Sequence, residues 1–229
     1  MTASQIELLN AGDHGALTLG ALTGAPPHFV QIVLDEFPAA ASLCPIFLTK
    51  SPQTGDFYVG AMLGFKPEEP VLVDNAERSG LFEPLDWARR GFYLSGEDVA
   101  VNVNDPRFSD PDGEPMFERD GRPTQPLGTM IRNLGRLQAG LDWTGKFIDA
   151  MLQHRLVEPI DVSLDFDDGE RLNLAGLYTI SLDSLGELDD AAALSLFRAG
   201  QLQAAYIMSQ SLRQVGRLAR RRNQRLAAG

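Results

Sequence analysis

Two stretches of the chain alternate apolar and polar residues on either side of a turn, and this pattern predicts two β-hairpins. In the first, the runs Pro45–Thr49 and Phe57–Phe65 flank a short segment rich in turn-forming residues. In the second, Ile160–Phe166 and Leu172–Ile180 flank an Asp-Gly turn, which is a strong local signal for a hairpin. Shorter strands are expected at Val71–Val73 and Asp98–Val103.

Apolar residues at three- and four-residue intervals predict helices in the second half of the chain. One such stretch runs from Leu127 to Val157, and Gly140 with Asp142–Thr144 is expected to divide it into two helices. A further helix should begin near Asp189 and end near Gly200, and another should run from Gln201 into the C-terminal tail. Short helical turns are expected at Glu36–Ser42 and Pro84–Arg90.

This order of elements predicts an α+β fold. We expect an antiparallel sheet with hairpins, helices packed on one side of it and a long C-terminal amphipathic helix. A single domain should span residues 1–229, with an arginine-rich helical tail from about residue 211 to 229. Between residues 104 and 126, five prolines exclude long regular elements. That segment is either a surface that contacts another molecule or an ordered coil over the sheet.

The last predicted helix carries an apolar seam and a separate basic face. Its seam is formed by Ala205, Met208, Leu212, Val215, Ala219 and Leu226, and Arg213, Arg217 and Arg220 share another face. Such a helix can pack on its own sheet, pair with a second copy or lie on an anionic membrane. We expect its first half to pack within the protein. We expect its arginine-rich end, with Arg213, Arg217, Arg220 and Arg221, to contact a partner.

Charge divides the chain into an acidic body and a basic tail. The formal net charge is −11, and six arginines lie between residues 213 and 225, where no carboxylate occurs. Removing these six from the 20 basic side chains leaves 14 against 31 acidic ones. Most of this surface would repel a phosphate backbone, so nucleic-acid binding is not expected.

Neither a secretory signal nor a transmembrane segment is expected from the hydropathy pattern. The first residues show no basic region followed by an apolar stretch, and no apolar run approaches the roughly 18 residues of a membrane helix. We therefore expect a cytoplasmic protein, with export without a cleaved signal left open.

Few residues suggest catalysis, and no cofactor or metal is expected. The chain contains one cysteine, three histidines without the spacing of a zinc site, and no glycine-rich phosphate loop. His14 and Glu36 are the candidate catalytic residues. Arg89 and Arg90, which follow Trp87 and precede Phe92, form a candidate site for a carboxylate or phosphate. The alternative, which we favour, is that both arginines pair with carboxylates of the chain itself.

Several dispersed segments resemble the SapC family of bacterial proteins, in the same order and over nearly the whole chain. These segments are His14, Glu36-Phe37, Pro45–Phe47, Leu63–Phe65, Val71–Asp74, Pro84, Arg89-Arg90, Gly113–Phe117, Asp120-Gly121, Leu174–Tyr178, Gly200–Leu202 and Ser211-Leu212. The chain departs from the family at Arg78–Phe82, where relatives tend to show Gly-x-Trp, and at Gly91-Phe92. An aromatic platform at that site is therefore not expected.

The resemblance implies an accessory or binding role, because the family has no defined catalytic motif. Relatives tend to be encoded near TonB-dependent receptors, flavin-dependent halogenase-like enzymes and cupin-like proteins. Our first hypothesis is a non-enzymatic accessory or binding protein of an uptake or modification system, which acts through a protein partner or as a homodimer. The second is an enzyme with an unrecognised site built from His14, Glu36, Arg89 and Arg90. The third is a structural protein of a bacterial surface layer.

Overall fold

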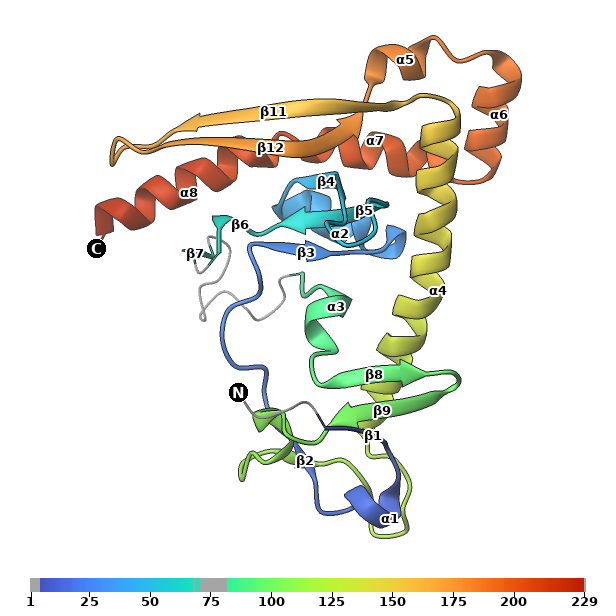
Figure 1. Cartoon of the computed structure of the whole chain (residues 1–229), viewed down its shortest axis with the longest axis vertical. Helices are drawn as coiled ribbons and strands as arrows, with labels where there is room; N and C mark the ends of the chain where they lie inside the picture. Colours follow the sequence, from blue (N-terminus) through green and yellow to red (C-terminus); the bar gives the residue numbers. More distant parts are fainter. Residues whose placement is uncertain (1–4, 68, 71–81, 229) are drawn as a thin grey trace. The chain divides into compact units, whose positions relative to one another are not determined.

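The chain forms an α+β structure, as predicted, in a computed structural model that describes residues 5–67, 69–70 and 82–228 (Figure 1). The strands are β1 (Ile6–Leu8), β2 (Thr18–Leu19), β3 (Phe29–Gln31), β4 (Ile46–Lys50), β5 (Phe57–Met62), β6 (Gly64–Lys66), β7 (Glu69–Pro70), β8 (Phe92–Ser95), β9 (Asp98–Asn102), β10 (Glu114–Pro115), β11 (Val157–Asp165) and β12 (Arg171–Ile180). The α-helices are α1 (Ala11–His14), α2 (Phe37–Leu43), α3 (Leu85–Ala88), α4 (Gln125–Gln153), α5 (Leu182–Gly186), α6 (Asp190–Arg198), α7 (Gln201–Ser211) and α8 (Gln214–Ala228). Two 3-10 helices, η1 (Leu34–Glu36) and η2 (Pro106–Phe108), complete these elements.

The chain divides into two compact units. Unit 1 comprises Met1–Gly24 and Leu85–Ala139, and unit 2 comprises Ala25–Pro84 and Gly140–Gly229. Helix α4 contributes residues to both. The expectation of a single domain over residues 1–229 stays a prediction.

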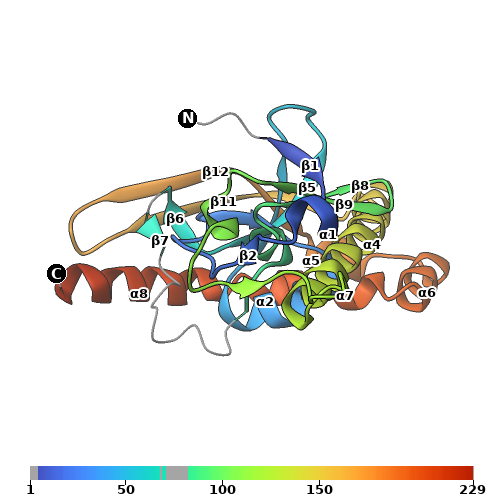
Figure 2. The same cartoon turned by 90° about the horizontal axis from the view of Figure 1, so that it is seen from below.

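Unit 2 is built on a five-stranded antiparallel sheet with the order β11-β12-β4-β5-β3. Both predicted hairpins are present in it, as β4–β5 and β11–β12. One face of the sheet packs against α8, where Leu218 joins Phe47 of β4, Val162 of β11 and Leu177 of β12 in a hydrophobic cluster. On each strand, alternate residues supply the side chains of this face. A shift of the pairing by one residue would turn them to the other face, so their burial fixes the register of the sheet. In Figures 1 and 2, α7 and α8 accordingly run along the β11–β12 hairpin.

Unit 1 contains the three-stranded sheet β1-β9-β8 and the short pair β10-β2. The strand predicted at Asp98–Val103 is β9, and the short helix predicted near Pro84–Arg90 is α3. The core of unit 1 is a hydrophobic cluster that includes Phe92, Phe108 and Met116. Phe108 and Met116 come from the proline-rich segment 104–126, so part of that segment is ordered coil packed on the core. The strand predicted at Val71–Val73 and residues 78–81 of the departure at Arg78–Phe82 lie outside the described residues.

Helix α4 is continuous, so the predicted break at Gly140 was wrong. Gly140 is a position of close packing, because a Cβ atom added there would lie 2.6 Å from Cγ2 of the buried Val33. The Thr144 hydroxyl donates to the Gly140 carbonyl at 2.7 Å and accepts from the Leu34 N–H at 3.0 Å. Gly140 and Thr144, which were expected to interrupt the helix, therefore join α4 to Val33 and Leu34, before α2.

The predicted C-terminal helix is divided into α7 and α8 at Leu212-Arg213. Two buried side chains bind other elements at this point. The Ser211 hydroxyl accepts from the Ile46 N–H at 2.8 Å, and the Gln214 amide donates to the carbonyls of Ala41 and Ser42. Around the division, backbone bonds such as Val215 N–H to Leu212 C=O span three residues, as in a 3-10 turn. Sequence periodicity contains no signal for these long-range contacts.

Candidate functional site

His14 serves a local structural role in unit 1. Its side chain is buried, with 3% of the residue exposed, and its Nδ1 accepts the Asn10 N–H at 3.2 Å. Nε2 is therefore the nitrogen that carries the proton toward Glu7 Oε2, 3.2 Å away. Nε2 thus joins α1 to β1, and Nδ1 binds the backbone of Asn10, the N-cap residue of α1.

Glu36 is buried in unit 2, with 4% of the residue exposed. Its Oε2 accepts the Val33 N–H at 3.0 Å, which satisfies a backbone donor at the start of η1. His14 and Glu36 thus lie in different units, and each bonds to residues close to it in sequence. Their catalytic role stays a prediction that these contacts do not support.

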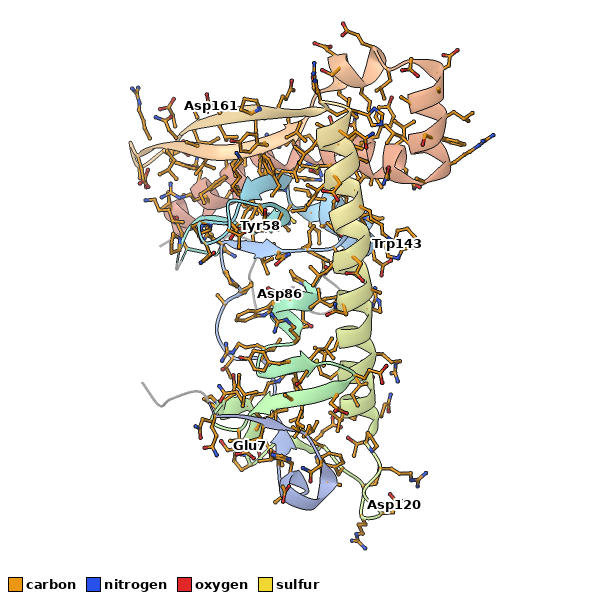
Figure 3. The ribbon with its side chains drawn as sticks, turned by 45° about the vertical axis from the view of Figure 1, so that its right-hand side comes forward. Glu7, Tyr58, Asp86, Asp120, Trp143 and Asp161 are labelled. Atoms are coloured by element: carbon orange, nitrogen blue, oxygen red, sulfur yellow. The ribbon has the colours of Figure 1, made fainter. Side chains whose placement is uncertain are left out.

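Arg89 and Arg90 pair with groups of unit 1. Arg89 binds Oδ1 of Asp86 (labelled in Figure 3) through Nη2 at 2.7 Å and Nε at 2.9 Å. Arg90 lies 3.6 Å from Asp105 and donates to the Thr23 carbonyl at 3.1 Å. Both guanidinium groups also lie near aromatic rings, at 5.8 Å from Tyr93 and 5.4 Å from Trp87. These contacts agree with internal pairing, and a ligand-binding role for the two residues stays a prediction.

The thiol of Cys44 is buried at the end of α2 and donates to the Ala40 carbonyl. Burial raises its pKa from 9.0 to about 12, so the thiol stays protonated and unreactive at neutral pH. Within the described residues, no group of three or more His, Cys, Asp or Glu side chains is arranged to hold a metal ion.

The tail arginines have two different environments, which the sequence alone does not distinguish. Arg222 is buried, and its guanidinium lies 4.0 Å from the centre of the Phe166 ring. It donates to Glu69 at 2.6 Å and to Glu170 at 2.7 Å, and Asp168 lies 3.5 Å away. We call Arg222, Glu69, Asp168 and Glu170 the Arg222 cluster. Glu170 also pairs with Lys66.

Arg222 occupies a position on the apolar seam of α8, seven residues after Val215. That spacing was the available signal for its burial. Burial alone would lower the pKa of Arg222, but the hydrogen bond that it donates to Glu69 and the charges of the three carboxylates outweigh this effect and raise it. The cluster therefore joins α8 to the β11–β12 turn and to β7 as a permanently charged group.

Arg213, Arg217 and Arg220 are exposed, and Arg221 is half-buried. Among the described residues, none of these four forms an ion pair with a carboxylate, although the chain as a whole is acidic. We call Arg213, Arg217 and Arg220 the basic face. Helical spacing predicted this face, and each of its three arginines is exposed and forms no ion pair with a carboxylate of the described residues.

A groove of about 410 Å³ lies between α2 and α7, next to the basic face. It is lined by Pro38, Ala41, Ser42, Tyr206, Ile207, Gln210 and Arg213. Tyr206 remains 48% exposed, so its ring is available at the edge of the groove. The sequence pattern gave no indication of the groove, because α2 and α7 are far apart in the chain.

A second hollow, of about 530 Å³, lies beside the β4–β5 turn. It is lined by turn residues together with Phe29, Gln31 and Tyr58, the last of which is labelled in Figure 3. Burial raises the pKa of Tyr58, so its phenol stays protonated at neutral pH. None of the candidate residues His14, Glu36, Arg89 and Arg90 lines this hollow.

The family model for SapC matches residues 9–218, which is nearly the entire chain. The chain belongs to the SapC family. The match confirms the resemblance inferred from dispersed segments, and it includes Arg213 and Arg217 of the basic face. No curated protein and no solved structure matched this SapC chain. In the described part of the chain, every helix is too short or too polar to cross a membrane.

Proposed function

We propose that this SapC-family chain is a non-enzymatic accessory or binding protein that acts through a protein partner in a bacterial uptake or modification system. The observation that carries the proposal is the basic face. Three exposed arginines lie there without an ion pair among the described residues, on a chain with a formal net charge of −11. Charged surfaces of this kind steer association with a partner of opposite charge.

The contacts of the candidate catalytic residues support the same proposal. His14, Glu36 and Arg89 each bind groups of the chain itself, and the Cys44 thiol is held in its protonated form. The partner we propose is a flavin-dependent halogenase-like or cupin-like enzyme of the same system, in keeping with the family resemblance. A homodimer is the alternative arrangement, and the cytoplasm is the proposed location.

Reversing the charge of the basic face should remove partner capture. We expect Arg213→Glu/Arg217→Glu/Arg220→Glu to retain less than about a tenth of the wild-type capture, because like charges opposed across an interface cost more than the ~1.4 kcal/mol of a ten-fold change. The measurement is co-purification of the tagged full chain with the products of neighbouring genes, scored by quantitative mass spectrometry.

Arg198→Glu is the matched control, because Arg198 is an exposed arginine at the end of α6, outside the basic face. It should leave capture unchanged, and all variants should keep the thermal midpoint of the wild type. Truncation of α8 is unsuitable, because it would remove the buried residues Leu218 and Arg222. Full capture by the triple variant, or turnover of a substrate by the isolated chain, would contradict the proposal.

A further inference from the structure

The groove between α2 and α7 is formed by elements that are fixed to each other. Gln214 is buried, and its amide donates to the carbonyls of Ala41 at 2.8 Å and Ser42 at 3.1 Å. Ala41 and Ser42 form part of the groove wall. On the opposite side of α7, Ala205 and Met208 are fully buried in unit 2. The groove is thus preformed, as most ligand sites are.

The lining of the groove is mainly apolar and carries a positive charge at one end. Tyr206, Ile207, Pro38 and Ala41 supply apolar surface, and Arg213 is the charged residue of the lining. The volume of the groove lies at the small end of the ~300–1,000 Å³ that is typical of ligand pockets. This size suits an anchoring side chain better than a cofactor.

The basic face continues from this end of the groove along α8. Arg217 Nη1 lies 3.4 Å from Gln214 Oε1, and Gln214 itself contacts the groove wall. Arg220 lies one turn beyond Arg217 on the same face. No carboxylate follows Asp190 in the chain, so the helices that carry the groove and the basic face contribute no acidic residue.

We propose that this groove takes a large apolar side chain from an acidic amphipathic helix of the partner, while carboxylates of that helix pair with Arg213, Arg217 and Arg220. The inference rests on the proposed function and specifies the chemistry of the partner. An amphipathic helix inserts its apolar side chains into such grooves at three- and four-residue intervals. The same spacing places its acidic residues beside the anchor, where the basic face meets them.

Charge argues for a short acidic segment over an extended anionic surface. Apart from the six tail arginines, the chain carries 31 acidic against 14 basic side chains. A membrane or a nucleic acid would extend over more of this acidic chain than a single helix, which meets only the groove and the basic face. Interactions with more distant charges are screened beyond ~8 Å at physiological ionic strength.

The test is selection from a random library of helix-forming peptides of about 15 residues on the full-length chain. We expect selected peptides to combine Leu, Phe or Trp with Asp or Glu three or four positions away. Binding of these peptides, measured by fluorescence anisotropy, should weaken at least about ten-fold in Tyr206→Ala and in Arg213→Glu. Matched controls on α6, Phe197→Ala and Arg198→Glu, should change it less than about two-fold, since both residues are exposed and lie outside the groove.

Three results would overturn the inference: no enriched peptide, enrichment without acidic residues, or binding that Tyr206→Ala and Arg213→Glu leave unchanged. Sedimentation with vesicles of phosphatidylglycerol and light scattering each test one further result that would overturn the inference. Vesicle binding that Arg213→Glu abolishes would assign the basic face to a membrane, and a dimer that Tyr206→Ala dissociates would assign the groove to a second copy.

Failure of the inference can be told apart from failure of the proposed function. If Tyr206→Ala retains the co-purified partner while the triple charge reversal loses it, the basic face binds the partner and the groove does not take part. If peptides bind the groove but capture does not depend on the basic face, the proposed function fails instead.

Discussion

Arg222→Ala is expected to lower the free energy of unfolding by about 3 kcal/mol. Removing one partner of a buried ion pair typically costs ~3–5 kcal/mol, and the partial exposure of Glu69 and Glu170 reduces this to the lower end of that range. The variant also loses the contact between the guanidinium and the Phe166 ring. Because the pKa of Arg222 is raised, its contribution is complete at neutral pH and is lost only as the pH rises through that elevated value.

Urea unfolding followed by circular dichroism measures this effect. The matched control is Arg220→Ala, an exposed position on the same helix, which should change stability by less than about 0.5 kcal/mol. Arg222→Lys should fall between the two, because lysine keeps the charge but cannot bind Glu69 and Glu170 through a planar fork. An Arg222→Ala variant as stable as Arg220→Ala would show that the cluster does not stabilise α8.

Gly140→Ala should destabilise the protein by about 1–2 kcal/mol, although alanine favours a helix interior by ~1 kcal/mol over glycine. The added Cβ would lie 2.6–3.0 Å from three side-chain atoms of Val33, which is fully buried and β-branched. Overpacking of a filled core typically costs ~1–3 kcal/mol, and Val33 has no flexible end that could move away.

A double-mutant cycle with Val33→Ala tests this explanation. Val33→Ala removes Cγ1 and Cγ2 but keeps Cβ, which would lie 2.7 Å from the new methyl group, so Gly140→Ala should be clearly less destabilising in that background than in the wild type. Gly135→Ala is the matched control, because it lies in the same helix with no atom within 4 Å of the added Cβ, and it should be stabilising. Destabilisation by Gly140→Ala of equal size in the wild-type and Val33→Ala backgrounds would contradict the assignment.

Local signals predicted much of the fold. The Asp-Gly turn between β11 and β12 and the turn between β4 and β5 set up both hairpins over short sequence separations. Asp189 caps α6 by accepting the Ala192 N–H at 2.8 Å, and Gly200, with φ of 71°, separates α6 from α7. In each case the residue that determines the conformation lies within the element or next to it.

The errors arose where distant contacts decide the conformation. Gly140 interrupts the apolar pattern of α4 because Val33 occupies the space of its side chain. The division between α7 and α8 depends on Ser211 and Ile46, which are 165 residues apart. The burial of Arg222 depends on carboxylates of β7 and the β11–β12 turn. Periodicity describes a single element, and it contains no information on which other element supplies these partners.

For the candidate site, too, the sequence predicted local features but not contacts between distant segments. Helical spacing alone placed Arg213, Arg217 and Arg220 on one face, and all three are exposed. The groove beside them requires α2 to lie against α7, so only the structure could reveal it. His14 and Glu36 were selected by residue type, both form hydrogen bonds within the chain, and their catalytic role stays a prediction.

Photo-crosslinking in native cells tests the central claim most directly, that the groove and the basic face form the docking surface. With p-benzoylphenylalanine in place of Gln210, at the groove, we predict one abundant adduct in which mass spectrometry places the crosslink in an acidic helical segment of the partner. The adduct should disappear when Arg213→Glu and Arg217→Glu are added, and it should not form when the crosslinker replaces Arg198. Equal adducts from positions 210 and 198, or an adduct that survives the charge reversal, would contradict the claim.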